Sequence, residues 1–179
     1  MCVIIIKPCG AKMPDERELN RAYMCNPDGC GFVSEKHFYK GLSFQAFKKK
    51  LSEVGEDEAC IMHFRLATNG SIRRANCHPF KRGDVYFAHN GVLSIRPAGD
   101  KTDSQTAFDD ILYPIIEEYG LDSKELKTAV NGIIGHSKFA FLQNGQITTF
   151  GEFIRHDGRL YSNLRHLNTP WSFDFNDLF

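Results

Sequence analysis

The chain has 179 residues, of which 42% are hydrophobic and 25% are charged, and these proportions are typical of a globular protein with one sizeable core. Its 22 basic and 22 acidic side chains balance, so the overall charge gives no reason to expect binding to nucleic acid or to an anionic membrane surface. We therefore expect a single domain over residues 1–179 that has neither nucleic acid nor a membrane as a partner.

The first ten residues contain one apolar run, Val3–Ile6, which is too short for a membrane span or for the core of a signal peptide. We therefore expect a cytoplasmic location. A chain of this length does not need disulfide bonds to hold a core, and its cysteines show no regular framework, so free thiols are expected. The six cysteines stand at positions 2, 9, 25, 30, 60 and 77.

Strand and helix signals alternate through the first half of the chain. The β-branched run Val3–Ile6 predicts a buried strand that starts directly after residue 2. Pro14 and Asp15 predict the start of a short helix, and Ser43 predicts the cap of another. The elements expected after the first strand are a helix at 14–23, a turn at 26–29, an extended stretch at 31–39 and a helix from 44 to about 54.

The second half of the chain has clear cap and turn signals. Thr102 and Gln105 fit a capping pattern before an amphipathic helix, which Pro114 is expected to bend or shorten. Ser123 predicts the cap of the next helix. In chain order, the expected elements are strands at 59–67 and 85–88, helices at 102–119 and 123–134, hairpin turns at 144–145 and 157–158, and a tail at 170–179.

Short motifs in a fixed order carry the functional signal. They are Cys2, Asn26–Gly31, His63–Gly70 with Asn76–Phe80, Ala88–Gly91 and Thr102–Gln105. This order resembles the class II glutamine amidotransferases, the N-terminal-nucleophile family that releases ammonia from glutamine. The chain looks most similar to the family's small stand-alone bacterial hydrolases. The resemblance covers roughly residues 2–112, and Tyr161–Leu164 is similar to a later Ser-Asn segment of the family.

The resemblance implies an α+β fold with four layers, α/β/β/α, in which two stacked antiparallel sheets lie between layers of helices. It also implies a cysteine amidohydrolase that acts on glutamine or a glutamine-like small molecule and needs neither a cofactor nor a metal. We find no Gly-rich phosphate loop after residue 112, which leaves a separate synthetase as the expected ammonia acceptor. Hydrolysis of a γ-glutamyl or related amide is the alternative activity.

Cys2 is the candidate nucleophile by this resemblance. A free thiol has a pKa of about 8.5, so efficient attack requires a nearby base or positive charge. Removal of Met1 would expose the α-amino group of Cys2, whose ordinary pKa is about 7.7 to 8.0. One residue would then supply both the nucleophile and its base. Without the other motifs, Cys2 would be interpreted as a small apolar residue at the start of a strand.

Asn90 and Gly91 are the candidate oxyanion hole. Attack on an amide builds negative charge on oxygen, and donors placed in advance stabilise that charge. The resemblance assigns this role to the Asn90 side-chain amide and the Gly91 backbone N–H. The alternative is that Asn90-Gly91 forms an ordinary hairpin turn after the strand at 85–88.

Arg65, Asp103 and Thr68 are the candidate substrate-binding residues. Free glutamine carries an α-carboxylate and an α-ammonium group, so its recognition needs a positive group at one end and an acid at the other. The resemblance assigns the carboxylate to Arg65, with an added hydroxyl contact from Thr68, and the ammonium to Asp103. The alternatives are a surface strand residue at Arg65 and a helix N-terminal acid at Asp103.

Histidines and turn residues near these motifs are expected to support the pocket. We expect His63, His78 and His89 to act in this way rather than as general bases, and the same holds for the Asp28–Gly29 turn.

Two alternatives from other classes stay open. One is a metal-binding module, because Cys60 and His63 have Cys-x-x-His spacing and Cys77-His78 could add ligands. In a strand, however, Cys60 and His63 would point to opposite faces. The other alternative is a catalytically silent glutamine-binding subunit that regulates a partner.

Overall fold

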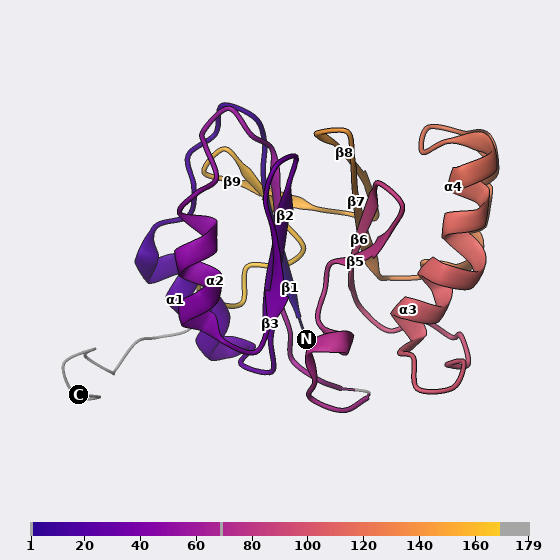
Figure 1. Cartoon of the computed structure of the whole chain (residues 1–179), viewed down its shortest axis with the longest axis horizontal. Coiled ribbons are helices and arrows are strands. Elements are labelled where there is room, and N and C mark those ends of the chain that lie inside the picture. The colour runs from indigo at the N-terminus through magenta and orange to yellow at the C-terminus, as the bar shows by residue number, and fades with distance from the viewer. Residues whose placement is uncertain (1, 69, 169–179) are drawn as a thin grey trace.

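The structure is a computed structural model that describes residues 2–68 and 70–168. Two antiparallel sheets stack face to face, with helices α1 and α2 covering the outer face of one sheet and α3 and α4 covering the outer face of the other (Figure 1). This arrangement confirms the predicted four-layer α/β/β/α fold. The tail expected at 170–179 lies outside the described residues.

The first sheet has six strands in the order β3-β2-β4-β1-β10-β9. Side chains alternate along its central strand, so Val3 and Ile5 pack beneath the helices while Ile4 and Ile6 face the second sheet. The strands are β1 (Val3–Lys7), β2 (Cys30–Ser34), β3 (Phe38–Gly41), β4 (Cys60–Phe64), β9 (Ile154–His156) and β10 (Arg159–Tyr161), and the covering helices are α1 (Glu16–Cys25) and α2 (Phe44–Leu51).

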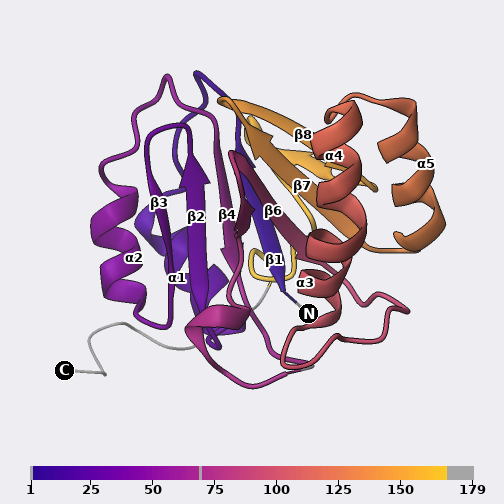
Figure 2. The same ribbon diagram turned by 45° about the vertical axis from the view of Figure 1, so that its right-hand side comes forward.

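The second sheet has four strands in the order β5-β6-β7-β8. Its outer face packs against the C-terminal helices, and α5 lies beside α4 (Figure 2). The helical run from 103 to 119 contains a π-helical turn at residues 108–112. This turn comes just before Pro114, the residue that was expected to bend or shorten the helix. The elements are β5 (Phe80–Arg82), β6 (Val85–Asn90), α3 (Asp103–Ala107), η2 (Phe108–Leu112), α4 (Tyr113–Tyr119), α5 (Lys124–Ile133), β7 (Lys138–Gln143) and β8 (Gln146–Phe150).

The stretch at 31–39 differs from the prediction, because it forms the hairpin β2-β3 rather than one extended segment. No Gly or Pro marks its turn. Instead, the buried Glu58 carboxylate holds the turn by accepting hydrogen bonds from the Ser34 hydroxyl at 2.8 Å and the Lys36 N–H at 3.3 Å. Glu58 is distant in sequence, so a local pattern could not indicate this turn. The short strand β5 was also not expected.

The sheets place three chain segments close together. The antiparallel pair Val3↔Phe64 sets the start of β1 beside the end of β4, and β6 ends in the second sheet at Asn90. The predicted strand at 59–67 stops at Phe64, which frees the following residues to form a loop. Within residues 2–68 and 70–168, no helix combines the length and hydrophobicity needed to cross a bilayer.

Candidate active site

Cys2 lies at the start of β1, beside the loop that follows β4. Its Sγ is 3.4 Å from the donating Leu66 N and 3.5 Å from the Leu66 carbonyl oxygen. The Asn163 side-chain amide donates to the Cys2 carbonyl at 2.9 Å. These contacts fix both the main chain and the thiol of Cys2. All six cysteines are free.

Burial raises the pKa of the Cys2 thiol above its ordinary value. The Leu66 backbone hydrogen bond and the positive charge of Arg65 act in the opposite direction but are weaker. The thiol is therefore protonated at neutral pH, and it needs a base to become a nucleophile.

The loop after β4 is held by the predicted supporting turn. The Asp28 N–H donates to the Arg65 carbonyl at 3.0 Å, and the Arg65 N–H donates to the Gly29 carbonyl at 2.8 Å. The Asp28 carboxylate accepts the Ala67 N–H at 2.8 Å. Arg65 is only 4% exposed, and its Nη1 donates to the Ser71 carbonyl at 3.1 Å. The guanidinium is thus a buried charge held in a loop rather than a surface strand residue.

Asn90 and Gly91 do not form a hairpin turn. Asn90 is the last residue of β6, paired with Lys138 of β7, and the chain leaves the sheet at Gly91. Gly91 has φ +146°, and a Cβ there would clash with the Ser137 Oγ, so the position requires glycine. The Asn90 amide is buried and its Nδ2 donates to the Ser162 Oγ at 2.8 Å.

Asp103 is the first residue of α3, which Thr102 caps by accepting the Gln105 N–H at 3.1 Å. Its carboxylate accepts the Leu93 N–H at 3.0 Å and the Ser104 N–H at 2.8 Å. The Ser104 hydroxyl also lies 2.7 Å from the buried His89 Nδ1. Asp103 is thereby held in one orientation while staying half-buried.

One small pocket brings together five of the six predicted site residues. Its wall places a thiol, a guanidinium and a carboxylate around one space. The five are Cys2, Arg65, Thr68, Gly91 and Asp103, and the wall also includes Leu66, Ala67, Asn76, His78, His89, Thr102 and Ser104. Asn90 adjoins Gly91 but is not in this wall. The motifs Thr102–Gln105 and Tyr161–Leu164 contain three further polar residues to which the sequence assigned no role, namely Ser104, Ser162 and Asn163. Their hydrogen-bond partners His89, Asn90 and Cys2 are distant in the sequence, so no local pattern indicates these contacts.

The three histidines form a buried group at the pocket, in which His78 and His89 line the wall and His63 packs against His78. The ring centroids of His63 and His78 are 4.4 Å apart, and those of His78 and His89 are 6.4 Å apart. Burial lowers the pKa of His63 to about 3 and that of His89 to about 4, and it holds the pKa of His78 well below its ordinary value. All three rings are therefore neutral at neutral pH.

The Cys-x-x-His pattern does not form a metal site. Cys60 packs in the core beneath α1 and α2, whereas His63 reaches the backbone of His89 in the second sheet. The two side chains lie on opposite faces of β4, as strand geometry requires. Among residues 2–68 and 70–168, no group of three or more His, Cys, Asp or Glu side chains is placed to hold a metal ion.

These histidines predict a pH dependence of stability. The folded chain keeps the rings neutral, whereas the unfolded chain protonates them below about pH 6.5. The free energy of unfolding should therefore fall as pH drops from 6.5 towards 4.5, by up to about 1.4 kcal/mol per pH unit for each ring. Urea denaturation at pH 7.5, 6.5 and 5.5 measures this slope. Equal stability at all three values would contradict neutral burial.

The fold and the pocket together define a class of protein. Two stacked antiparallel sheets between helices, with a thiol at the start of a central strand, are the architecture of N-terminal-nucleophile hydrolases. The family model for class-II glutamine amidotransferases matches residues 52–162, more than half of the chain. The chain belongs to this family.

Solved structures agree on the fold. Glutamine phosphoribosylpyrophosphate (PRPP) amidotransferase from B. subtilis, complexed with ADP and GMP, superposes with a TM-score of 0.58 at 15% sequence identity. A structure described as the allosteric regulatory enzyme of purine biosynthesis gives the same TM-score at 16% identity. Each comparison covers 94% of this chain but only 43% of the other chain. No curated protein sequence matches the chain.

Proposed function

We propose that the chain is a glutaminase-type amide hydrolase that uses Cys2 to release ammonia from glutamine. The observation that carries the proposal is the single pocket lined by the Cys2 thiol, the Arg65 guanidinium and the Asp103 carboxylate. Membership of the class II amidotransferase family supports glutamine as the substrate. The proposal treats residues 1–179 as one amidotransferase domain in the cytoplasm, a reducing compartment that suits its free thiols.

The proposed mechanism begins with removal of Met1. The new α-amino group takes the Cys2 proton, which is needed because burial keeps the thiol protonated. The thiolate adds to the side-chain amide carbon, and the Asn90 amide and the Gly91 N–H stabilise the oxyanion. The C–N bond then breaks, ammonia leaves with a proton from the amino group, and water hydrolyses the thioester to glutamate.

Substrate recognition follows from the charges in the pocket. Arg65 is buried beside the thiol, where a planar guanidinium can hold both oxygens of an α-carboxylate. Asp103 offers the opposite charge for the α-ammonium group. Thr68 is exposed at the pocket and is proposed to add a hydroxyl contact to the carboxylate. A neutral amide without these charged ends would bind less tightly.

We further propose that the ammonia passes to a separate synthetase partner. In both solved structures the superposed region is only 43% of the chain, so in those proteins a domain of this fold occurs together with further protein. A test is whether glutamine turnover rises when candidate synthetases are added.

The proposed function is tested by labelling and turnover together. The purified protein is incubated with glutamine, and ammonia and glutamate are measured in parallel. A second sample is treated with the glutamine-analogue electrophile 6-diazo-5-oxo-norleucine, followed by intact mass and peptide mapping. Loss of Met1, equal amounts of both products and one adduct on Cys2 support the proposal. Retained Met1 with neither product nor adduct favours a silent glutamine-binding subunit instead.

A further inference from the structure

The Ser162 hydroxyl joins the two sheets beside the candidate active site. It accepts the Ile4 N–H of β1 at 2.8 Å and the Asn90 Nδ2–H of β6 at 2.8 Å. Its own N–H donates to the Ile4 carbonyl at 3.0 Å, and the residue is only 4% exposed. One buried hydroxyl therefore touches both the strand that carries the nucleophile and the proposed oxyanion donor.

The hydrogen bonds around Asn90 are unequal. Its Nδ2 is bonded to Ser162, whereas its Oδ1 is buried without a hydrogen-bond partner among the described residues. A buried acceptor without a partner destabilises the folded state, because it has lost its hydrogen bonds to water. In this orientation one of the two Nδ2–H groups is bonded to Ser162, and only the second is left for a substrate oxygen. Ser162 Oγ accepts both of its hydrogen bonds here, so its own O–H does not donate to Asn90.

A half-turn of the Asn90 carboxamide exchanges two groups of nearly equal size and reverses this pattern. Ser162 would still accept the Ile4 N–H and would donate its O–H to the Asn90 Oδ1. The Asn90 Oδ1 then has a hydrogen-bond partner, and neither Nδ2–H group is bonded to Ser162, so both are left for an oxygen of the substrate. A serine hydroxyl permits both arrangements, because it has one donor and two acceptor lone pairs.

We propose that Ser162 is a positioning residue that orients the Asn90 amide so that its N–H group meets the substrate oxyanion. The inference rests on the proposed function, since it explains how the oxyanion hole of that reaction is set. Ser162 acts through Asn90 and does not touch the substrate.

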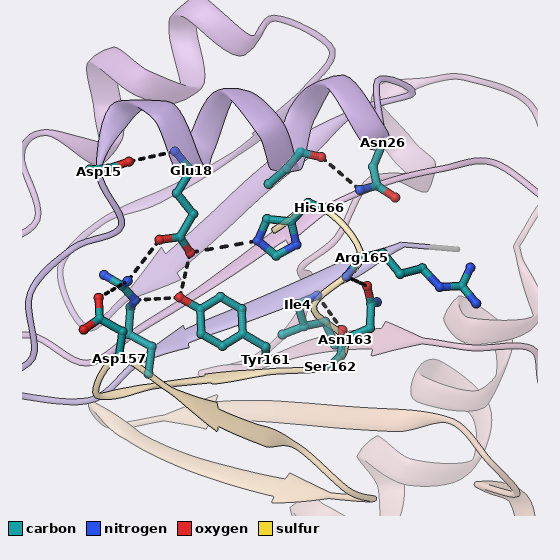
Figure 3. Close-up of polar contacts among 12 residues, drawn as sticks. Ile4, Asp15, Glu18, Asn26, Asp157, Tyr161, Ser162, Asn163, Arg165 and His166 are labelled. Carbon is teal, nitrogen blue, oxygen red and sulfur yellow. Dashed lines mark hydrogen bonds and ion pairs between the residues drawn. The ribbon is translucent and has the colours of Figure 1, made fainter. Parts of the chain in front are cut away.

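The neighbouring side chains fix Ser162 in place. Tyr161 points to the opposite face of the segment, into a buried cluster beneath α1, where its hydroxyl donates to the Glu18 carboxylate at 2.6 Å (Figure 3). Arg159 binds the same carboxylate at 3.0 Å. On the other side of Ser162, Asn163 holds the Cys2 carbonyl at 2.9 Å. The segment is thus anchored on both sides, and the hydroxyl is held where Asn90 can use it.

The test compares Ser162→Ala in the wild-type and in the Asn90→Ala background. In the wild type, kcat for glutamine should fall about 10- to 100-fold with KM changed little, because an oxyanion-hole donor acts mainly in the transition state. In the Asn90→Ala background, Ser162→Ala should have almost no further effect on kcat. Alkylation of Cys2 by iodoacetamide forms no tetrahedral oxyanion, so its rate should stay within about twofold of wild type as Ser162 is changed.

Two further variants, Ser162→Thr and Ser162→Val, control for the shape of the side chain. They have nearly the same shape, and Val carries a methyl group where Thr carries the hydroxyl. We expect the Thr variant to keep more than about ten times the kcat of the Val variant at equal thermal stability. If the losses in kcat from Ser162→Ala and Asn90→Ala multiplied in the double mutant, the inference would be overturned. Equal kcat for the Thr and Val variants would also overturn it, and neither result would contradict the proposed function. Wild-type protein that neither turns over glutamine nor labels at Cys2 would overturn both.

Discussion

Replacing Cys2 by alanine should abolish glutamine turnover, with a loss in kcat of at least about 10⁴-fold, while the protein stays folded. The size follows from removal of a covalent nucleophile, which leaves only binding and oxyanion stabilisation. Folding should survive because the Sγ makes only long contacts with Leu66, and the Asn163 bond to residue 2 goes to its main chain. Coupled ammonia release and the thermal midpoint measure the two effects.

A matched control is available in the same chain. Cys9 is an exposed free cysteine outside the pocket, so Cys9→Ala should keep wild-type turnover. Cys2→Ser places a hydroxyl where the thiol was, but the higher pKa of the hydroxyl makes it harder to activate, and this variant should be nearly as inactive as Cys2→Ala. Normal turnover by the Cys2→Ala variant would exclude the mechanism, whatever the fold.

Local chemistry predicted the starts of helices and the tight turns. Ser43, Thr102 and Ser123 each cap a helix by accepting a main-chain N–H within the first turn, as expected. Asp15, which with Pro14 was expected to open a helix, is the cap of α1. The hairpin signals at 144–145 and 157–158 also form turns, with Asn144 and Asp157 both at positive φ. These features depend on residues three or four positions apart, so the sequence contains all the information that they need.

Long-range contacts could not be predicted in the same way. The β2-β3 turn depends on Glu58, which no local pattern connects to Ser34. The buried Glu18 cluster depends on Tyr161, which lies at the other end of the chain. In each case the decisive hydrogen bond joins residues that only the assembled sheets bring together. The stacking of two antiparallel sheets between helices was therefore available from the family resemblance and not from periodicity, and the order of the strands came only from the structure.

The candidate site was predicted from two kinds of information, the chemistry of single residues and the order of the motifs along the chain. Chemistry alone explained why a thiol, an acid and an arginine suit glutamine, but only the motif order selected Cys2, Arg65 and Asp103 among other residues of the same types. The structure then placed these three in one pocket wall. It also added Ser162, whose partners Ile4 and Asn90 come from different sheets. No spacing in the sequence could have indicated that junction.

Arg65 and Asp103 should divide the recognition of glutamine between its two charged ends. Arg65→Met preserves much of the side-chain volume but removes the charge, and kcat/KM for glutamine should fall about 10³-fold because charge-assisted hydrogen bonds to the α-carboxylate are lost. Arg65→Lys should restore little, because an ammonium group cannot hold both oxygens in one plane. Asp103→Asn should lower kcat/KM about 10- to 100-fold, since the introduced carboxamide keeps hydrogen-bonding capacity without the charge.

Substrates that lack one charged end make the assignment specific. Glutamine α-amide has no α-carboxylate, so Arg65→Met should lower its kcat/KM far less than that of glutamine. N-Acetylglutamine has no α-ammonium, so it should be the substrate that Asp103→Asn affects least. The pocket geometry predicts that each variant affects a different substrate least. Arg65 lies in the loop after β4 of the six-stranded sheet, whereas Asp103 begins α3, which covers the four-stranded sheet. If each variant lowered turnover of all three substrates equally, the two residues would be supporting the pocket and not reading the substrate.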